Sequence, residues 1–444
     1  MKNTTKLLAA GALTLGLAPE GARGGSGDAA PNLVLITLDD MNWDSVGAYG
    51  SEVPGITPHM DRLAHEGMRF QHAYIQTPAC SPSRNVLTTG RYPHTSGVTG
   101  FFNVVADYQT LPEALRDRGY LTGVINKPRD SSPNDDYDRF WDHHLILTND
   151  VKREAEHYAA PLDAFLDRAS EHGGPFFCVV NVADPHKPFY GDPKADEKGS
   201  GVVPSRVYSP SDVPIPDSLP EHPDIRQEMA NYYNSVRRGD DCVGAVLKVL
   251  EARGVMDDAV IMLLSDHGMP LPFAKSMLYR EGVRTPWVVR WPGKVKAGSV
   301  DSEHLISAID FAPTVLDLAG AETPEGMQGR SFAPLLRGEQ QVGREYVVAE
   351  FNENAGGRPR PSRAIHGERF GYIFNAWATG EYPFIAAWTW HNTYKVMQRM
   401  ARDDPAVAER FRFLRFRTVE ELYDFEADPY ALNNLIEDPA YRGV

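Results

Sequence analysis

Short apolar runs alternate with amphipathic helical stretches from Pro31 onward. The runs are hydrophobic at consecutive positions, which is typical of strands that are buried on both faces of a sheet. The predicted strands are Leu33–Leu38, Leu121–Ile125, Phe176–Val182, Ala259–Leu264 and Trp287–Trp291. The predicted helices are Pro58–Glu66, Thr110–Arg118, Met229–Arg253 and Leu305–Ala319. This alternation predicts an α/β fold with a large, mostly parallel sheet that helices cover on both faces.

The pattern changes after about Gly343, where a smaller antiparallel sheet is expected. Its predicted strands are Glu345–Phe351, Arg369–Asn375 and Phe384–Trp390. A basic loop is predicted at Gly356–Arg363, and the Pro- and Asp-rich segment Tyr190–Asp224 is predicted as a long surface loop. We therefore expect an N-terminal segment at residues 1–30, an α/β domain at 31–343 and an α+β subdomain at 344–444.

The N-terminus has the pattern of an export signal. Lys2 and Lys6 precede the apolar run Leu7–Leu17, and small residues follow as far as Ala30. The run is too short to span a bilayer, so it predicts a signal peptide and a periplasmic or secreted protein. A buried or disordered tail is the alternative. No later apolar run is long enough, and free enough of charge, to predict a membrane span.

The 444-residue chain has a formal net charge of −15. This charge excludes a fold-wide attraction for nucleic acid, so an anionic substrate must be bound by a local concentration of positive charge. The three cysteines are too few for a disulfide framework. Cys178 and Cys242 are predicted to be core thiols, and a bond between them stays open.

Reactive side chains follow the ends of four predicted strands. They are Asp39 and Asp40, Asn126 and Lys127, Asp184 and His186, and Asp266 and His267. In open α/β sheets, ligands bind beyond the carboxyl ends of the strands. We therefore expect three acids, two imidazoles and a lysine to converge on one site from distant segments of the chain.

Three of these acids form a candidate metal site. Asp39, Asp40 and Asp266 are hard oxygen ligands, with His267 beside them. Such a set suits Ca²⁺ or Mg²⁺ better than a soft metal, and a divalent cation would offset the repulsion between adjacent carboxylates. The alternative is that Asp39 caps a helix and Asp40 is a solvated turn residue.

The most specific segment is Cys80–Arg91, which reads CSPSRNVLTTGR. Ser81 is predicted to cap a helix that Gly90 ends, so Cys80 would lie at a helix N-terminus, where backbone N–H groups favour anions. Arg84 lies one turn further on the same side. A thiol nucleophile and a modified residue both suit this setting, and the spacing does not choose between them.

The segment resembles the signature of the type I sulfatases, in which the cysteine is oxidised to formylglycine. Further motifs agree in order: LITLDD at Leu35–Asp40, TPHMDRLAHEG at Thr57–Gly67, DPH at Asp184–His186, SDHG at Ser265–Gly268, KSMLYREGVRTP at Lys275–Pro286, RWPG at Arg290–Gly293, DFAPTVLDLAG at Asp310–Gly320 and ELYDFEADPYALNNL at Glu421–Leu435. The chain is most similar to the heparan N-sulfatase (sulfamidase) branch. The resemblance implies the alkaline-phosphatase/sulfatase-like fold.

The resemblance also implies roles for particular residues. One Ca²⁺ per chain would be held by the following ligands: Asp39, Asp40, Asp266, His267 and Cys80 as formylglycine. Arg84 and Lys127 would hold the formylglycine, and Lys275 and His186 would contact the sulfate and the leaving oxygen. The implied reaction is hydrolysis of sulfate esters of polysaccharide-derived oligosaccharides through a calcium-bound gem-diol. The implied partner is a formylglycine-generating or anaerobic sulfatase-maturing enzyme.

Two departures from the family pattern affect substrate preference. Many relatives have an imidazole two residues after the lysine, where this chain has Arg129. Arg129 is expected to add positive charge for substrate binding, or His94 to supply the imidazole. Arg280 replaces a common glutamate, which here follows as Glu281.

Several alternatives stay open. Lys275 stands where the sulfamidases tend to carry arginine, which favours an O-sulfate over an N-sulfate. A phosphomonoester or phosphodiester hydrolase of the same superfamily is the more distant enzyme. Two further alternatives are a carbohydrate-binding protein with an inactive site, and a thiol-dependent hydrolase. The basic stretches Arg358–Arg363 and Arg410–Arg417 are candidate contacts for an anionic polysaccharide, or solvated cations.

Overall fold

The apolar runs form the centre of an eight-stranded sheet. The computed structural model describes residues 30–444 except 194, 196–200 and 355–357. The strands lie in the order β4-β3-β5-β1-β6-β7-β2-β8. Their bounds are β1 Leu33–Leu38, β2 Met68–Tyr74, β3 Leu121–Ile125, β4 His143–Leu145, β5 Phe176–Asn181, β6 Val260–Ser265, β7 Trp287–Arg290 and β8 Ser299–Ser307. Strands β3, β5, β1 and β6 run parallel, as predicted, and β7 is antiparallel to both of its neighbours.

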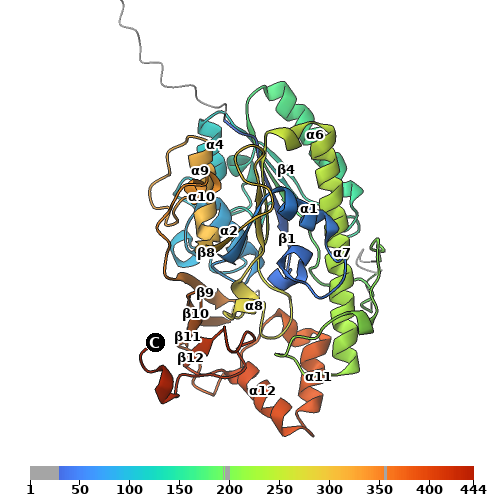
Figure 1. The fold of residues 1–444 in the computed structure, drawn as a ribbon, viewed down its shortest axis with the longest axis vertical. Helices are drawn as coiled ribbons and strands as arrows, with labels where there is room; N and C mark the ends of the chain where they lie inside the picture. The colour runs from blue at the N-terminus through green and yellow to red at the C-terminus, as the bar shows by residue number, and fades with distance from the viewer. Residues whose placement is uncertain (1–29, 194, 196–200, 355–357) are drawn as a thin grey trace, which may run out of the picture. The chain divides into compact units, whose positions relative to one another are not determined.

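Helices cover both faces of this sheet (Figure 1). Helices α1, α6 and α7 lie on one side, and α2, α4, α9 and α10 lie on the other. The helix bounds are α1 Pro58–Glu66, α2 Cys80–Thr89, α3 Pro93–Ser96, α4 Leu111–Asp117, α5 Tyr137–Phe140, α6 Glu156–His172, α7 Pro223–Ala252, α8 Arg280–Val283, α9 Phe311–Leu318, α10 Ala333–Leu336, α11 Asn392–Met400 and α12 Pro405–Phe416. The predicted α/β fold with a mostly parallel, doubly covered sheet is confirmed.

Helix α2 begins two residues earlier than expected. The amide of Ser83 donates to the carbonyl of Ala79 at 2.9 Å, so the first turn closes around Cys80. Ala79 is therefore the N-cap residue, and the prediction that Ser81 caps the helix is wrong. Gly90 ends the helix in the left-handed conformation (φ 61°), as its lack of a Cβ allows.

The predicted helix at Leu305–Ala319 is wrong in its first part and correct only over α9. Leu305 and Ile306 belong to β8, which pairs in parallel with β2 at the edge of the sheet. The chain turns at Ser307, whose amide donates to Asp310 Oδ2 at 3.0 Å, and α9 begins only after this turn. Neither edge strand was predicted, because half-exposed strands carry polar residues at alternate positions and lack a continuous apolar run.

Helix α7 begins at Pro223, six residues before its predicted start at Met229. Proline is well tolerated in the first turn of a helix, where its missing N–H leaves no hydrogen bond unmade. Most of the predicted loop at Tyr190–Asp224 is irregular where it is described, with one short turn of helix at Pro210–Asp212.

A four-stranded antiparallel sheet follows in the order β12-β11-β10-β9. Its strands are β9 Val347–Glu353, β10 Pro359–His366, β11 Phe370–Asn375 and β12 Glu420–Asp424. The expected loop at Gly356–Arg363 is wrong from Pro359 onward, because Ser362, Ala364 and His366 pack inward at alternate positions of an inner strand. The expected strand at Phe384–Trp390 is also wrong. Its rings stack on one another around Trp388, and the segment ends as a short helix, Ala387–Trp390.

Three further expectations concern the termini, the domains and the cysteines. The predicted signal peptide lies outside the described residues, and no described helix is long and apolar enough to cross a membrane. The boundary at residue 343 stays a prediction. Cys178 and Cys242 are buried free thiols, which confirms the prediction of core thiols, and no disulfide joins them.

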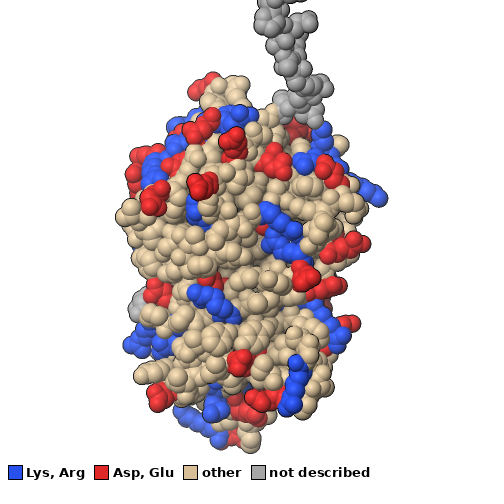
Figure 2. All heavy atoms as spheres, turned by 90° about the vertical axis from the view of Figure 1, so that its left-hand side faces the viewer, with Lys and Arg blue, Asp and Glu red and all other residues tan. Residues whose placement is uncertain are grey.

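Charges of both signs are interspersed on the face that Figure 2 shows. Lysine and arginine form no continuous surface there, which agrees with the acidic composition of the chain. Recognition of an anion on this face therefore depends on local groups of residues.

Candidate active site

Two neighbouring strand ends bring the predicted carboxylates together. Strands β1 and β6 are parallel and in register, with Leu38 opposite Ser265, so the residues that follow them share one edge of the sheet. The amide of Asp40 donates to Asp266 Oδ1 at 3.0 Å across this edge. Asp40 adopts a left-handed conformation (φ 70°), which aspartate tolerates better than most residues.

Cys80 faces this edge from the first turn of α2. Its Sγ lies 3.3 Å from His267 Nε2, 3.4 Å from Lys275 Nζ and 3.8 Å from Asp40 Oδ1. Burial raises the pKa of the Cys80 thiol well above its usual range, although Lys275 lowers it. A reactive thiolate is therefore disfavoured in this environment.

Nine predicted residues meet at this edge, and we call them the strand-tip cluster. The cluster consists of Asp39, Asp40, Cys80, Arg84, Lys127, His186, Asp266, His267 and Lys275. They come from segments far apart in the sequence and are buried or nearly so. The strand ends therefore meet at one site, as predicted.

The cluster offers the donor atoms that a hard divalent cation requires. Ligand atoms of Asp39, Cys80, Asp266 and His267 all lie within 4.8 Å of one another. The buried Oδ2 of Asp40 receives no hydrogen bond from the described residues. Because His267 Nδ1 lies 2.9 Å from the carbonyl of Gly268, its N–H is fixed there and the lone pair of Nε2 is left for a metal. The residues present therefore fit Ca²⁺ or Mg²⁺, with one nitrogen donor among the oxygens.

Three buried cations balance the three carboxylates. Arg84 pairs with Asp266 at 2.9 Å, Lys275 pairs with Asp40 at 2.6 Å, and Lys127 pairs with Asp39. Burial alone would raise the pKa of Asp39, but Lys127, His186 and Arg84 together hold it well below its usual range. The carboxylate is therefore kept ionised, as a metal ligand must be.

Residues that the sequence analysis missed hold Arg84 in place. Its Nη1 donates to Asn181 Oδ1 at 2.5 Å and to the hydroxyl of Thr37. Both acceptors are polar residues near the ends of the apolar strands β5 and β1. Their polarity within an apolar run is the one feature of the sequence that could have indicated a role in the site. Asn126 and Lys127 adopt left-handed conformations (φ 64° and 52°) directly after β3, and this turn places the Lys127 amine beside Asp39.

His186 presents one ring nitrogen to the cluster. Its Nδ1 lies 2.6 Å from the carbonyl of Lys187, so the N–H points there and Nε2 is left free to exchange a proton. Burial lowers the pKa of His186 to about 4, against the opposing effect of Asp40 and Asp39. Asp184, from the same motif, is instead enclosed by Arg153 at 3.2 Å and Arg238 at 2.5 Å.

Arg129 and His94 lie apart from the cluster. The side chain of Arg129 is 64% exposed, with Asp135 as its ion-pair partner at 3.8 Å. His94 pairs with Glu350 at 2.7 Å and stacks on Tyr92. No contact among the described residues links either to Cys80, so the substrate-binding role of Arg129 stays a prediction.

The C-terminal part of the chain contributes contacts that no motif predicted. Trp388 Nε1 donates to the carbonyl of Lys275 at 2.8 Å, and the hydroxyl of Ser276 donates to Asn354 at 2.9 Å. His391 Nδ1 lies 2.9 Å from the carbonyl of Pro270. These contacts fix the segment that presents Lys275 to the cluster.

Comparison with known proteins identifies the family. The sulfatase family model matches residues 31–321, and the model described as N-sulphoglucosamine sulphohydrolase, C-terminal, matches residues 266–386. The chain belongs to the sulfatase family. It is an enzyme of the class that hydrolyses sulfate esters.

Individual relatives agree with this assignment. An ulvan-active sulfatase of Formosa agariphila is 28% identical, over 93% of this chain and 72% of its own length. N-sulphoglucosamine sulphohydrolase of Homo sapiens is 28% identical, over 92% of this chain and 86% of its own. A solved structure in complex with its substrate D-glucosamine-2-N,6-O-disulfate has a TM-score of 0.69 at 22% identity, and it covers 93% of this chain and 95% of its own. This last similarity shows the shared fold.

Proposed function

We propose that this sulfatase hydrolyses sulfate esters of sulfated carbohydrates, in particular oligosaccharides derived from polysaccharides, and releases inorganic sulfate. The observation that carries the proposal is the strand-tip cluster, in which Cys80 lies against candidate metal ligands and three cations. The relatives named for ulvan and for N-sulphoglucosamine support a carbohydrate substrate.

The proposed cofactors are one Ca²⁺ and formylglycine at position 80. When bound together, they supply a hydroxyl nucleophile of lowered pKa at neutral pH. In the unmodified chain, Cys80 Sγ marks the position of that hydroxyl, and Asp39, Asp40, Asp266 and His267 are the proposed ligands. A maturing enzyme would have to oxidise Cys80. Export to the periplasm or the medium is proposed from the N-terminal pattern.

Three cations are proposed to hold the sulfate group. Arg84, Lys127 and Lys275 are offset by three carboxylates, so a bound divalent cation would leave the cluster with net positive charge. Each preorganised donor is worth roughly 3 kcal/mol of transition-state stabilisation, and together they reach the lower part of the range that enzymes need. Lys275, which lies 3.4 Å from Cys80 Sγ, is proposed to contact both the nucleophile and the sulfate.

His186 is proposed to protonate the leaving oxygen from Nε2. Its pKa of about 4 makes the imidazole neutral in the empty site at pH 7. The negative charge of an arriving sulfate favours the imidazolium form, so substrate binding would raise this pKa and load the proton. Its Nδ1–H stays fixed on the carbonyl of Lys187, which keeps the ring in orientation.

A second candidate is hydrolysis of N-sulfoglucosamine. The match of residues 266–386 to the C-terminal model of that enzyme favours it, whereas Lys275 in place of arginine favours an O-sulfate. Glucosamine 6-sulfate and glucosamine N-sulfate, assayed side by side for released sulfate, separate the two.

The test of the proposed function is desulfation of a panel of defined sulfated oligosaccharides, with an aryl sulfate and an aryl phosphate as simple substrates. We expect sulfate release to exceed phosphate release and to be lost after treatment with an aldehyde-reactive hydrazide, but not with iodoacetamide. Preferential phosphate release would support the phosphohydrolase alternative, and the opposite reagent sensitivity would support a thiol nucleophile. No release from any polymer, with Cys80 unmodified in the native host, would support a binding protein.

A further inference from the structure

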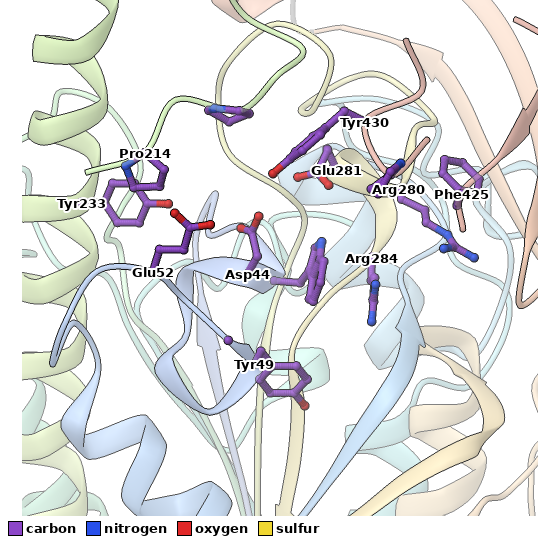
Figure 3. A pocket seen from close by; sticks show the side chains of 14 residues that line it. Asp44, Tyr49, Glu52, Pro214, Tyr233, Arg280, Glu281, Arg284, Phe425 and Tyr430 are labelled. Carbon is purple, nitrogen blue, oxygen red and sulfur yellow. The ribbon is translucent and has the colours of Figure 1, made fainter. Parts of the chain in front are cut away.

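A cavity of about 410 Å³ lies next to the strand-tip cluster and contains none of its residues. Its walls come from residues 43–52, from Tyr233 of α7, from α8 and Arg284, and from residues 425–430 (Figure 3). Pockets of this volume are in the range that binds small molecules. Gly268 packs so closely on the carbonyl of Glu281 that a Cβ would come within 1.7 Å of it, so the cavity and the cluster share a rigid wall.

Two buried arginines form one side of this cavity. Arg280 and Arg284 are 9% and 8% exposed, and the amide of Arg284 donates to the carbonyl of Arg280 at 2.8 Å, one turn apart. Arg280 lies 4.2 Å above the ring of Phe425, and Arg284 lies 3.6 Å above the ring of Trp43. The aromatic rings and the helical turn thus hold both guanidinium groups in fixed positions.

Neither arginine has an ion-pair partner among the described residues. One terminal nitrogen of Arg280 donates to the carbonyl of Gly367 at 3.0 Å, and one of Arg284 donates to the carbonyl of Gln71 at 2.7 Å. The buried Nε of Arg280 has no acceptor in the described chain. Two buried cations without a carboxylate are costly, and the cost is offset when an anion binds between them.

Three acids also line the cavity, namely Asp44, Glu52 and Glu281. The side-chain amide of Asn42 donates to Asp44 at 2.7 Å and to Glu281 at 2.5 Å, and neither carboxyl group forms an ion pair with Arg280 or Arg284. Burial, together with the nearby Asp44, raises the pKa of Glu281 to about 8. Glu281 therefore carries a proton at neutral pH and is able to donate a hydrogen bond. The hydroxyl of Tyr430 points toward Glu281 in Figure 3.

We propose that this cavity is a second binding site, for a small acidic carbohydrate whose carboxylate or sulfate lies against Arg280 and Arg284 and whose hydroxyls meet the acids and tyrosines of the lining. The two buried arginines favour a ligand that carries an anionic group. The carboxylic acid of Glu281 and the hydroxyls of Tyr233 and Tyr430 suit the hydroxyls of a sugar ring. Tyrosine faces also pack well against such rings.

The test is calorimetric titration of the Cys80→Ala protein, in which turnover is removed. The probes are glucuronate, glucosamine 6-sulfate and uncharged glucose. We expect at least one charged probe to bind and glucose not to bind. Arg284→Gln should weaken binding at least tenfold, whereas the exposed control Arg399→Gln and the cluster variant Lys275→Ala should leave it unchanged. The charged probe that binds more tightly identifies the preferred anionic group.

Three results would overturn the proposal. They are failure of both charged probes to bind, unchanged binding in Arg284→Gln, and binding that Lys275→Ala removes, which would place the sugar in the strand-tip cluster. If Arg284→Gln does not fold, Tyr430→Ala replaces it, since Tyr430 lies on the loop at the cavity edge. Tyr430→Ala should weaken binding several-fold, and unchanged binding would count against the site. None of these outcomes depends on sulfatase turnover.

Discussion

Two groups of buried cations lie close together and differ in what faces them. Arg84, Lys127 and Lys275 each contact a carboxylate at a strand end. Arg280 and Arg284 contact backbone carbonyls and aromatic rings, and no carboxylate of the described chain lies within ion-pair distance. Similar burial therefore has two consequences. The first group is balanced by carboxylates, and its cations hold the pKa of Asp39 and Asp40 below the usual range, whereas the second group has no ion-pair partner in the described chain and would be balanced by an anion from outside.

The largest expected effect is that of Cys80→Ala. If position 80 supplies the nucleophile, the variant should lose at least about 10³-fold in sulfate release, because the remaining donors bind sulfate but cannot attack it. The melting temperature should change little, since the side chain is small. A variant with near-native turnover would contradict the assignment of the nucleophile.

Asp266→Ala should break the balance of the first group. It removes a proposed metal ligand and leaves Arg84 buried without its partner, so we expect loss of bound metal and destabilisation of about 3–5 kcal/mol. Metal content and denaturant unfolding measure the two effects. Arg84→Gln in the same background should recover part of the stability but not the metal. Retention of the metal would remove Asp266 from the ligand set.

Lys275→Ala should lower kcat by about 10²-fold or more, through loss of one preorganised donor. Lys395→Ala, on the exposed face of α11, is the matched control and should have no effect. Steady-state kinetics on the preferred sulfated substrate make the comparison. An equal loss in both variants would show that general charge, rather than position, is responsible.

His267→Asn should change the metal preference of the cluster by a smaller factor, about tenfold. An imidazole nitrogen favours Mn²⁺ or Zn²⁺ relative to Ca²⁺, and an amide oxygen favours Ca²⁺. Calorimetric titration of the Cys80→Ala protein with Ca²⁺ and Mn²⁺, with and without the change, gives both affinities. An unchanged ratio would indicate that Nε2 is not a ligand, although it faces Cys80.

The smallest effect belongs to the second group and depends on pH. The pKa of Glu281 is raised to about 8 by burial, from an ordinary value of 4.5. The folded state therefore binds a proton that the unfolded state loses, and the stability from this group falls as pH rises from about 5 to 8. Glu281→Gln has no such proton, so its stability relative to the parent should increase across this range. Urea unfolding at both ends checks the sign.

The centre of the fold and the members of the first group were predictable for one reason. Strands β1, β5 and β6 are apolar on both faces, and their ends define where Asp39, Asp40 and Asp266 lie. The edge strands β4 and β8 lack this pattern. In the C-terminal sheet, the arginines of β10 suggested a loop, because exposed faces look alike in loops and strands.

The second group shows what a sequence does not reveal. Arg280 and Glu281 were noted as departures from the family pattern, but whether an arginine is paired depends on distant residues. The carbonyls of Gln71 and Gly367 and the rings of Trp43 and Phe425 are contacts between segments that no local pattern connects. The support of Lys275 by Trp388 and Asn354 is likewise long-range.

The central claim is that one divalent cation is shared by the strand ends and position 80. An anomalous difference map from crystals grown with Mn²⁺ in place of Ca²⁺ tests it directly. We predict a single strong peak within about 2.0–2.6 Å of oxygens of Asp39, Asp40 and Asp266 and of the side chain at position 80. A map with no peak there, or with its peak away from position 80, would contradict this account.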